Sequence, residues 1–167
     1  KLNILNAKYD VEVTDKLKNI KIFSDEITYL KNDEIIFTTN NSKAIKEELT
    51  ITADIFNYNR LNNILTAEKK VKINDAAKDN LIFSEKITYF IDEEKFYSED
   101  NTEAVIEQKY SFLSKNVYLD RNLMELSSKE RTLIKDNNFN RYELKEFKYF
   151  YDKKLLKGID IKIITNE

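Results

Sequence analysis

The sequence predicts an all-β protein: a bent antiparallel β jelly roll of about eleven strands, built from hairpin repeats of about thirty residues. Three observations predict this fold: a sequence repeat, short polar turns between apolar runs, and a change in side-chain alternation inside those runs. A chain of 167 residues is long enough for a domain with a sizeable core, so we expect a single domain over residues 1–167.

The repeat is visible when the sequence is shifted against itself. Residues 3–45 align with 63–105 without a gap, and sixteen of the forty-three positions are identical. A fixed period of this kind is the sequence signature of a repeat architecture. Each unit divides again, because five similar segments begin 29, 31, 30 and 30 residues apart, at Ser24, Ala53, Ser84, Ser114 and Leu144. The repeating element is therefore about half of the longer unit.

Short polar turns follow these segments, at residues 31–33, 59–63, 92–94, 120–122 and 152–154. Asn and Asp are frequent there, and both tolerate left-handed backbone and bond to their own main chain. Short turns between β-branched and aromatic runs indicate antiparallel hairpins. Five hairpins and a leading strand at 4–13 give about eleven strands. The terminal strands are expected at about 3–13 and 155–164.

The alternation of side chains changes phase inside each segment. Ile22 and Ser24 share one parity in the first segment, whereas Ile27 and Tyr29 share the other. In a flat strand this slip would send the second half to the opposite face, but a bulge or bend returns both halves to one interior. The same slip in every segment predicts a sheet folded along a crease into a V, with Ser or Ala at the bend.

The inward positions are apolar or aromatic, and we interpret them as candidates for lining a groove that binds an apolar ligand. A stack of bent strands encloses a channel along the stacking axis, and small residues at the bend would keep it from filling. An ordinary packed core is the alternative, as in a structural β-solenoid stalk or adhesin-like repeat without a lipid ligand. The groove candidates are Ile22, Ile27, Tyr29, Ile51, Phe56, Tyr58, Ile82, Ile87, Tyr89, Phe112, Val117, Phe147 and Tyr149, joined by Ile64, Val71 and Ile73.

Composition argues against catalysis. The chain has no Cys, His, Pro or Trp, and its one glycine is Gly158. These absences remove most zinc sites, thiol nucleophiles and the usual general base, and no glycine-rich phosphate loop exists. Acidic pairs such as Asp33-Glu34 and Glu99-Asp100 lack the glycine of calcium-binding repeats and alternate with Lys. We therefore expect no enzyme activity, no cofactor and no metal.

Charge and hydropathy limit the partners further. The formal net charge is -2, with basic and acidic residues interleaved, whereas a nucleic-acid binder would carry a basic stripe. No apolar run approaches the ~20 residues of a membrane-spanning helix. Lys1-Leu2-Asn3 opens directly into a strand-like pattern and not into a signal peptide. If the protein is exported, we expect these residues to be a mature segment.

Several segments resemble the OstA-like repeats of the lipopolysaccharide (LPS) transport family. Those repeats read approximately Ala-Asp-x-Val-x-Tyr, a turn, and Ala-x-Gly-x-Val-x-Ile, and residues 53–58 and 67–73 are similar to them. Residues 81–106 resemble the next copy. Residues 114–158 are most similar to the periplasmic N-terminal domain of the LPS-assembly proteins, LptD. The glycine of the family pattern is replaced by Lys69 in one copy and by Asp100 in another.

The resemblance implies a periplasmic β-taco attached to the outer membrane. Its apolar groove would bind LPS and conduct the lipid A acyl chains toward an outer-membrane β-barrel that continues the chain. It also implies a related β-taco bridge protein that pairs with the N-terminal edge strand, where Ile4 and Val11 are the docking candidates. Because no nucleotide-binding loop is present, the energy for transport would come from elsewhere.

Overall fold

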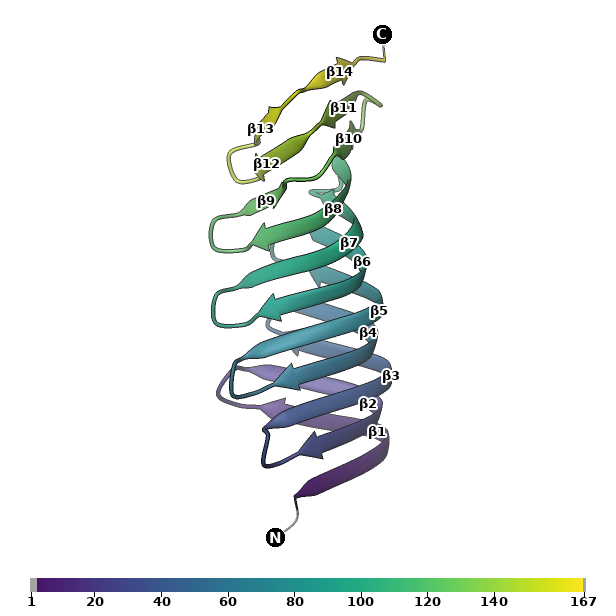
Figure 1. Cartoon of the computed structure of the whole chain (residues 1–167), viewed down its shortest axis with the longest axis vertical. Coiled ribbons are helices and arrows are strands. Elements are labelled where there is room, and N and C mark those ends of the chain that lie inside the picture. Colours follow the sequence, from purple (N-terminus) through teal and green to yellow (C-terminus); the bar gives the residue numbers. More distant parts are fainter. Residues whose placement is uncertain (1–2, 167) are drawn as a thin grey trace.

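Eleven long strands, most of them bent near the middle, stack into one twisted sheet that is folded along a crease (Figure 1). The computed structural model describes residues 3–166. All neighbouring strands are antiparallel, and residues 3–166 contain no helix and hence no membrane-spanning helix. The predicted bent all-β fold is confirmed. Lys1 and Leu2 of the opening segment lie outside the described residues.

Fourteen strands are counted because the last three long strands are interrupted at the bend. The eight continuous strands are β1 (Ile4–Asp15), β2 (Ile20–Leu30), β3 (Ile35–Lys46), β4 (Leu49–Asn59), β5 (Ile64–Asp75), β6 (Asn80–Phe90), β7 (Lys95–Ile106) and β8 (Tyr110–Asp120). The interrupted strands are β9 (Glu125–Ser128) with β10 (Thr132–Asp136), β11 (Arg141–Leu144) with β12 (Glu146–Phe150), and β13 (Leu155–Ile159) with β14 (Lys162–Ile164).

The crease divides the sheet into two limbs. Limb A ends in the turns between β1 and β2, β3 and β4, β5 and β6, β7 and β8, and β10 and β11. Limb B ends in the intervening turns. The sheet forks after β8, which pairs with β10 on limb A and with β9 on limb B. The line along which the turns of the two limbs meet, opposite the crease, is called the seam below.

Two kinds of bend alternate along the stack. In β2 the buried residues Ser24 and Ile27 are three positions apart, which is the predicted change of parity. In β5 the buried residues Ala67 and Val71 are four positions apart, so parity is preserved. The register explains the difference: two residues of β5, Lys69 and Lys70, lie opposite a single residue of β6 at the bend. A bulge at the crease is present in each neighbouring pair of the continuous strands β1–β8.

This second kind of bend corrects one prediction. Ile64 was expected to face inward with Val71 and Ile73, but Leu65 does so and is 2% exposed, while Ile64 is only partly buried. Because the bend in β5 adds two residues and not one, the alternation continues unchanged through it. The buried positions on both sides of that bend are all odd-numbered.

Left-handed backbone makes the bends possible without glycine. Lys69 and Lys70 have φ of 65° and 53°, and Asp100 has φ of 58°. Lys69 and Asp100 stand where the OstA-like pattern has glycine, the residue that adopts this conformation most easily. Other residues adopt it at a cost of roughly 1–2 kcal/mol each, so the surrounding structure must compensate.

Buried hydroxyl groups inside the crease supply part of that compensation. The Ser24 Oγ lies 3.0 and 2.9 Å from the carbonyl oxygens of Thr39 and Asn40. Thr38 Oγ1 is 2.6 Å from the Ser42 Oγ and accepts the N–H of Phe56 at 3.0 Å. Bulges release backbone groups from the strand ladder, and buried backbone groups need partners. Serine and threonine at the crease provide those partners.

The same arrangement recurs along the stack. The Ser98 hydroxyl donates to the Ser84 Oγ at 2.8 Å and also bonds to Thr102. Farther along, the Oγ of Ser114 lies 2.7 Å from Thr132 Oγ1. Ser24, Ser84 and Ser114 were expected to leave space in a channel, whereas here they take part in the polar network of the bend.

Thr38→Val tests this network. Thr38 is fully buried, so valine preserves shape while it removes the partner of Phe56 N–H and of the Ser42 hydroxyl. We expect the free energy of unfolding in urea to fall by about 1–3 kcal/mol. Thr66→Val on the outer face of β5 is the matched control and should change it by less than about 0.5 kcal/mol. Equal effects of the two variants would contradict the role of the crease hydroxyls.

Candidate functional site: the interior of the V and its seam

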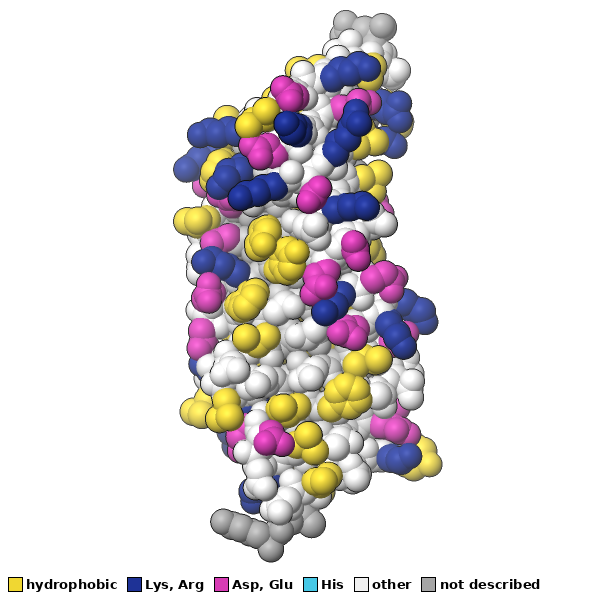
Figure 2. Space-filling view, viewed as in Figure 1, with side chains coloured by type: hydrophobic (Ala, Val, Ile, Leu, Met, Phe, Trp, Pro, Cys, Tyr) yellow, Lys and Arg dark blue, Asp and Glu magenta, His cyan; other side chains and the backbone are white. Residues whose placement is uncertain are grey.

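The predicted groove residues line the interior between the limbs. Twelve of the thirteen have exposures of 4% or less, and Tyr29 is partly buried. Aromatic contacts join the limbs directly, since Phe112 of limb A lies 5.3 Å from both Phe147 and Tyr149 of limb B, measured between ring centroids. Figure 2 shows the outer face of one limb, on which hydrophobic and charged side chains are interspersed. The limbs are in contact in this structure.

The interior is accessible at the N-terminal end of the stack. A cavity of about 380 Å³ lies there, lined mainly by apolar residues, among them Leu5, Val13, Ile27 and Ile36. Arg60 contributes a charged group to the same lining. We call this cavity the N-terminal mouth. It places the apolar interior in contact with solvent at one end.

A column of tyrosines, interrupted by Leu119 in β8, lies between the apolar interior and the seam. Tyr29, Tyr58, Tyr89 and Tyr149 are each the last inward residue of a limb B strand. The Tyr89 ring is stacked on Phe96, with centroids 4.2 Å apart. Tyrosine combines an apolar ring with a polar tip, and these positions are at the strand ends, next to the turns.

The first charged cluster at the seam joins Asp15 of limb A to limb B. The Tyr58 hydroxyl donates to the Asp15 carboxylate at 2.9 Å, and Arg60 Nε donates to it at 3.2 Å. Arg60 Nη1 donates to Glu34 at 2.5 Å and to the Tyr29 hydroxyl at 3.3 Å. Burial alone would raise the pKa of Asp15, but the hydrogen bonds from Tyr58 and Arg60 hold it below its ordinary value.

A second cluster repeats this arrangement farther along the seam. Asp75 is fully buried on limb A and accepts the Nε–H of Arg121 at 2.7 Å. Arg121 also donates to Glu94, which in turn pairs with Lys46 of limb A. Burial opposes ionisation of Glu94, but Lys46 and then Arg121 hold its pKa below the usual range. We call the two clusters, Asp15–Arg60–Glu34 and Asp75–Arg121–Glu94, the seam latches.

The latches follow the sequence repeat. Asp15 and Asp75, and likewise Glu34 and Glu94, are among the identical positions sixty residues apart. Arg60 and Arg121 are equivalent as well, because the backbone N–H of each donates to the carbonyl of its glutamate partner, at 2.9 and 3.0 Å. Sequence analysis did not select these residues as a site. The sequence does distinguish the two aspartates, because Asp15 and Asp75 have inward parity in strands whose other inward residues are apolar.

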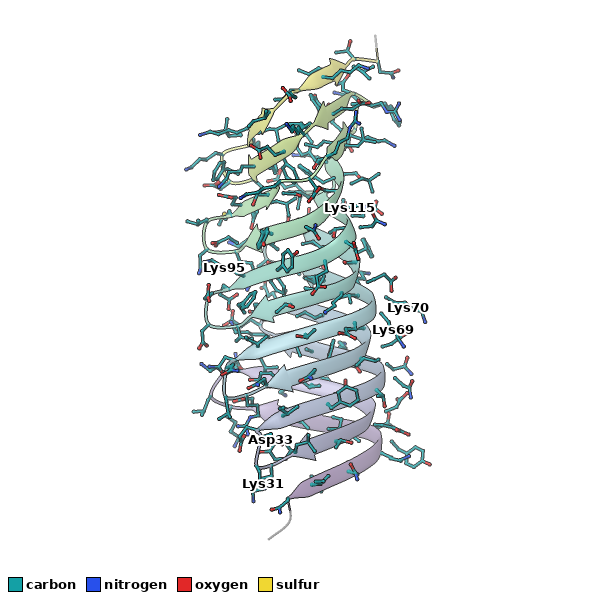
Figure 3. All side chains as sticks on the ribbon, in the orientation of Figure 1. Lys31, Asp33, Lys69, Lys70, Lys95 and Lys115 are labelled. Atoms are coloured by element: carbon teal, nitrogen blue, oxygen red, sulfur yellow. The ribbon has the colours of Figure 1, made fainter. Side chains whose placement is uncertain are left out.

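Charged residues outside the latches lie mostly on the outer surface. In Figure 3, Lys69, Lys70 and Lys115 lie on the crease side, whereas Lys31, Asp33 and Lys95 lie at the opposite side, at or beside the turns of limb B. Lys18 crosses the seam and its Nζ lies 2.5 Å from the Asp92 carboxylate. Within residues 3–166, no three His, Cys, Asp or Glu side chains are grouped so as to hold a metal ion.

Comparison with solved structures finds a similar arrangement in LptH from Pseudomonas aeruginosa, described as the LptA-homologous periplasmic component of the conserved lipopolysaccharide transport device. The TM-score is 0.40 and the sequence identity 9%, with 98% of this chain and 95% of that chain covered. No protein-family model and no curated protein matches the sequence.

Asp75→Asn tests whether the latches hold the limbs together. The substitution leaves the guanidinium of Arg121, which is largely buried, without one of its two carboxylate partners. We expect the free energy of unfolding to fall by about 3 kcal/mol. In contrast, Glu26→Gln removes the exposed ion pair with Lys8 on the outer face and should cost less than about 1 kcal/mol. A loss at Asp75 no larger than that at Glu26 would rule out a structural role for the latch.

Proposed function

We propose that the chain binds lipopolysaccharide and conducts its lipid A acyl chains between the two limbs, in the periplasm and as a domain attached to the outer membrane. The observation that carries the proposal is the arrangement of polarity in the V. An apolar interior runs along the stack from the N-terminal mouth, and polar groups are confined to the crease and the seam. An amphiphile with its chains inside and its headgroup at the seam matches this arrangement.

The energetics of acyl-chain binding are compatible with a closed interior. When the limbs part, contacts such as Phe112 with Phe147 are replaced by contacts with the chain, so apolar surface stays out of water. Each CH₂ group of the lipid that leaves water contributes about 0.8 kcal/mol. The opposing cost lies at the seam, where Asp15 and Asp75 must release their partners on limb B. Lipid insertion is therefore controlled by polar contacts.

A second candidate function is a structural β-solenoid stalk or adhesin-like repeat whose interior never opens. The near-complete burial of the groove candidates favours it, because no ligand is needed to fill the core. The two functions differ in one measurable respect. A conduit exposes its inward residues to lipid, and a stalk does not.

The ends of the stack support proposals about partners. The first edge is β1, where Ile4 and Leu5 are 55% and 50% exposed. The last strands carry Ile159 and Ile163, which are 50% and 60% exposed. Exposed edges accept a strand from another chain. We propose that a related β-taco bridge protein pairs with β1, and that an outer-membrane β-barrel continues the chain after the single domain of residues 1–167.

Photo-crosslinking distinguishes conduit from stalk. Benzoylphenylalanine replaces Phe112 or Phe147, which face the interior, or Phe37, which lies on the outer face of β3 and is 38% exposed. All three sites are aromatic, but the two inward ones are buried, so circular dichroism checks that each variant still folds. In a Gram-negative host we expect lipopolysaccharide to be captured at the two inward sites and not at position 37. Equal capture at inward and outward sites, or none at either, would contradict the conduit.

Ile4→Pro tests the docking edge. Asn3 accepts the N–H of Lys31 at 2.9 Å, so in the alternating antiparallel pattern the N–H of Ile4 points away from β2, toward the free edge. Proline at position 4 therefore blocks strand addition without removing a bond within the sheet. Val11, the other docking candidate, is partly buried near the N-terminal mouth and is less suitable for this test.

We expect Ile4→Pro to abolish head-to-tail association with the bridge protein in analytical ultracentrifugation, while the circular dichroism spectrum of the variant is retained. Leu5→Pro is the matched comparison, because it removes an N–H that faces β2 and should destabilise the strand itself. Association that persists in the Ile4→Pro variant would show that β1 is not the docking edge.

A further inference from the structure

Unpaired polar atoms are concentrated in one part of the seam. Within residues 3–166, six buried side-chain atoms lack a hydrogen-bond partner: both amide atoms of Asn80, Oε2 of Glu107, and the hydroxyls of Tyr89, Tyr149 and Tyr151. All five residues lie at or next to the seam ends of strands between β6 and β12. The crease hydroxyls make hydrogen bonds, and so do those of Tyr29 and Tyr58.

Tyr151 occupies a position that recurs in every limb B hairpin. Its backbone N–H donates to the carbonyl of Met124 at 3.1 Å, and the equivalent N–H groups belong to Lys31, Arg60, Ile91 and Arg121. A phenol therefore stands in the last hairpin where the two latch hairpins have a guanidinium. Burial first, and Asp75 next, raise the pKa of Tyr151 to about 12. The phenol remains a neutral group that can donate a hydrogen bond.

These polar groups form a strip along the seam. Tyr89 belongs to β6 and Tyr149 to β12, and β7, β8 and β9 lie between them on limb B. With neighbouring strands about 4.8 Å apart, the strip is about 20 Å long. Asn80 belongs to limb A, so the strip has members on both sides of the seam. Parting of the limbs exposes all of them together.

The lack of partners makes this part of the seam different from the first latch. A headgroup that enters near Asp15 must break the bonds from Tyr58 and Arg60. Between β6 and β12 the headgroup must still separate Arg121 from Asp75 and Glu94 from Lys46. It breaks no hydrogen bond to the hydroxyls of Tyr89, Tyr149 and Tyr151, however, and supplies partners that they lack. A buried polar group without a partner is costly, so parting the limbs here also removes that cost.

The chemistry of the strip selects the ligand. Phenol hydroxyls and the Asn80 amide both donate and accept, whereas the Glu107 carboxylate only accepts. Its Oε2 has Lys109 Nζ at 3.9 Å, beyond hydrogen-bond distance. Hydroxyl groups match this set because they too donate and accept. A phosphate diester has no proton to donate to Glu107, and Arg121, the nearby guanidinium, is already paired with Asp75 and Glu94.

We infer that the seam between β6 and β12 binds a hydroxyl-rich sugar headgroup of an amphiphile through Tyr89, Tyr149, Tyr151 and Asn80 when the limbs part. This inference rests on the proposed function, because the acyl chains of the same molecule occupy the interior beneath. Tyr89, Tyr149 and Tyr151 are specificity-determining residues in this account, and the apolar interior supplies affinity for the chain.

The test compares three probes on the full chain by isothermal titration calorimetry. Dodecyl maltoside has a sugar headgroup and a twelve-carbon tail, dodecyldimethylamine oxide has the same tail without the sugar, and maltose has the sugar without the tail. The variant Y89F/Y149F/Y151F removes three hydroxyls and keeps the rings that pack on Phe96 and Phe112. Y151F alone is a second, milder variant.

We expect the triple variant to bind dodecyl maltoside at least about ten-fold more weakly, since two or three hydrogen bonds are lost. Binding of dodecyldimethylamine oxide should be unchanged, and maltose alone should not bind. Y97F is the control, because Tyr97 lies on the outer face of β7, between the inward residues Phe96 and Ser98. It should leave the ratio of the two detergent affinities at the wild-type value. The thermal midpoint of the triple variant should be equal to or above wild type.

Three results would overturn the inference. If the affinity ratio is unchanged in the triple variant while both detergents bind, the headgroup site is wrong and the conduit stands. If maltose binds as tightly as the maltoside and the triple variant loses both, the strip is a site for free sugar. If neither detergent binds the wild-type chain, the proposed function fails, and this site fails with it.

Discussion

At the crease, the strands bend on bulges, and the backbone groups released there are bonded by serine and threonine hydroxyls such as those of Ser24 and Thr38. The bends bring both halves of a strand to face one interior, and repetition in register turns a flat stack into two limbs. The tyrosine column, the latches and the N-terminal mouth all exist because the limbs face each other. Without hydrogen-bonded bulges, the alternation in the even-numbered strands would place the two halves of each strand on opposite faces of the sheet.

Polarity is divided in a similar way along most of the stack. Hydroxyls lie at the crease, although in β4 and β5 Ala53, Ala67 and Val71 take their place, and charged groups and phenols lie at the seam. The contacts across the seam differ along its length. Salt bridges join the limbs at Asp15 with Arg60 and, farther along, at Asp75 with Arg121. In the last hairpin the position of these arginines is occupied by Tyr151. An opening of the limbs therefore costs different amounts at different levels of the stack.

Much of this could be predicted from the sequence, for identifiable reasons. The strand ends, the hairpins and the inward faces of the even-numbered strands follow from local alternation, and Ser24 with Ile27 gave the position of the bend directly. The bends of the odd-numbered strands add two left-handed residues, such as Lys69 and Lys70, and leave no trace in the alternation, so Ile64 was assigned to the wrong face. The latches join residues about 45 positions apart, such as Asp15 and Arg60, and depend on the tilt of one limb against the other, which no local pattern contains.

The central claim is that the limbs part to admit lipid, and the distance across the seam tests it directly. The chain has no cysteine, so Leu17→Cys and Leu61→Cys can carry a pair of spin labels. Both sites are in turns on opposite sides of the seam and are 89% and 68% exposed. A second pair at Asn40 and Lys70 reports on the crease. Pulsed electron paramagnetic resonance with lipopolysaccharide should show a longer distance across the seam and an unchanged one at the crease. Bound lipopolysaccharide with no change at the seam would contradict the account.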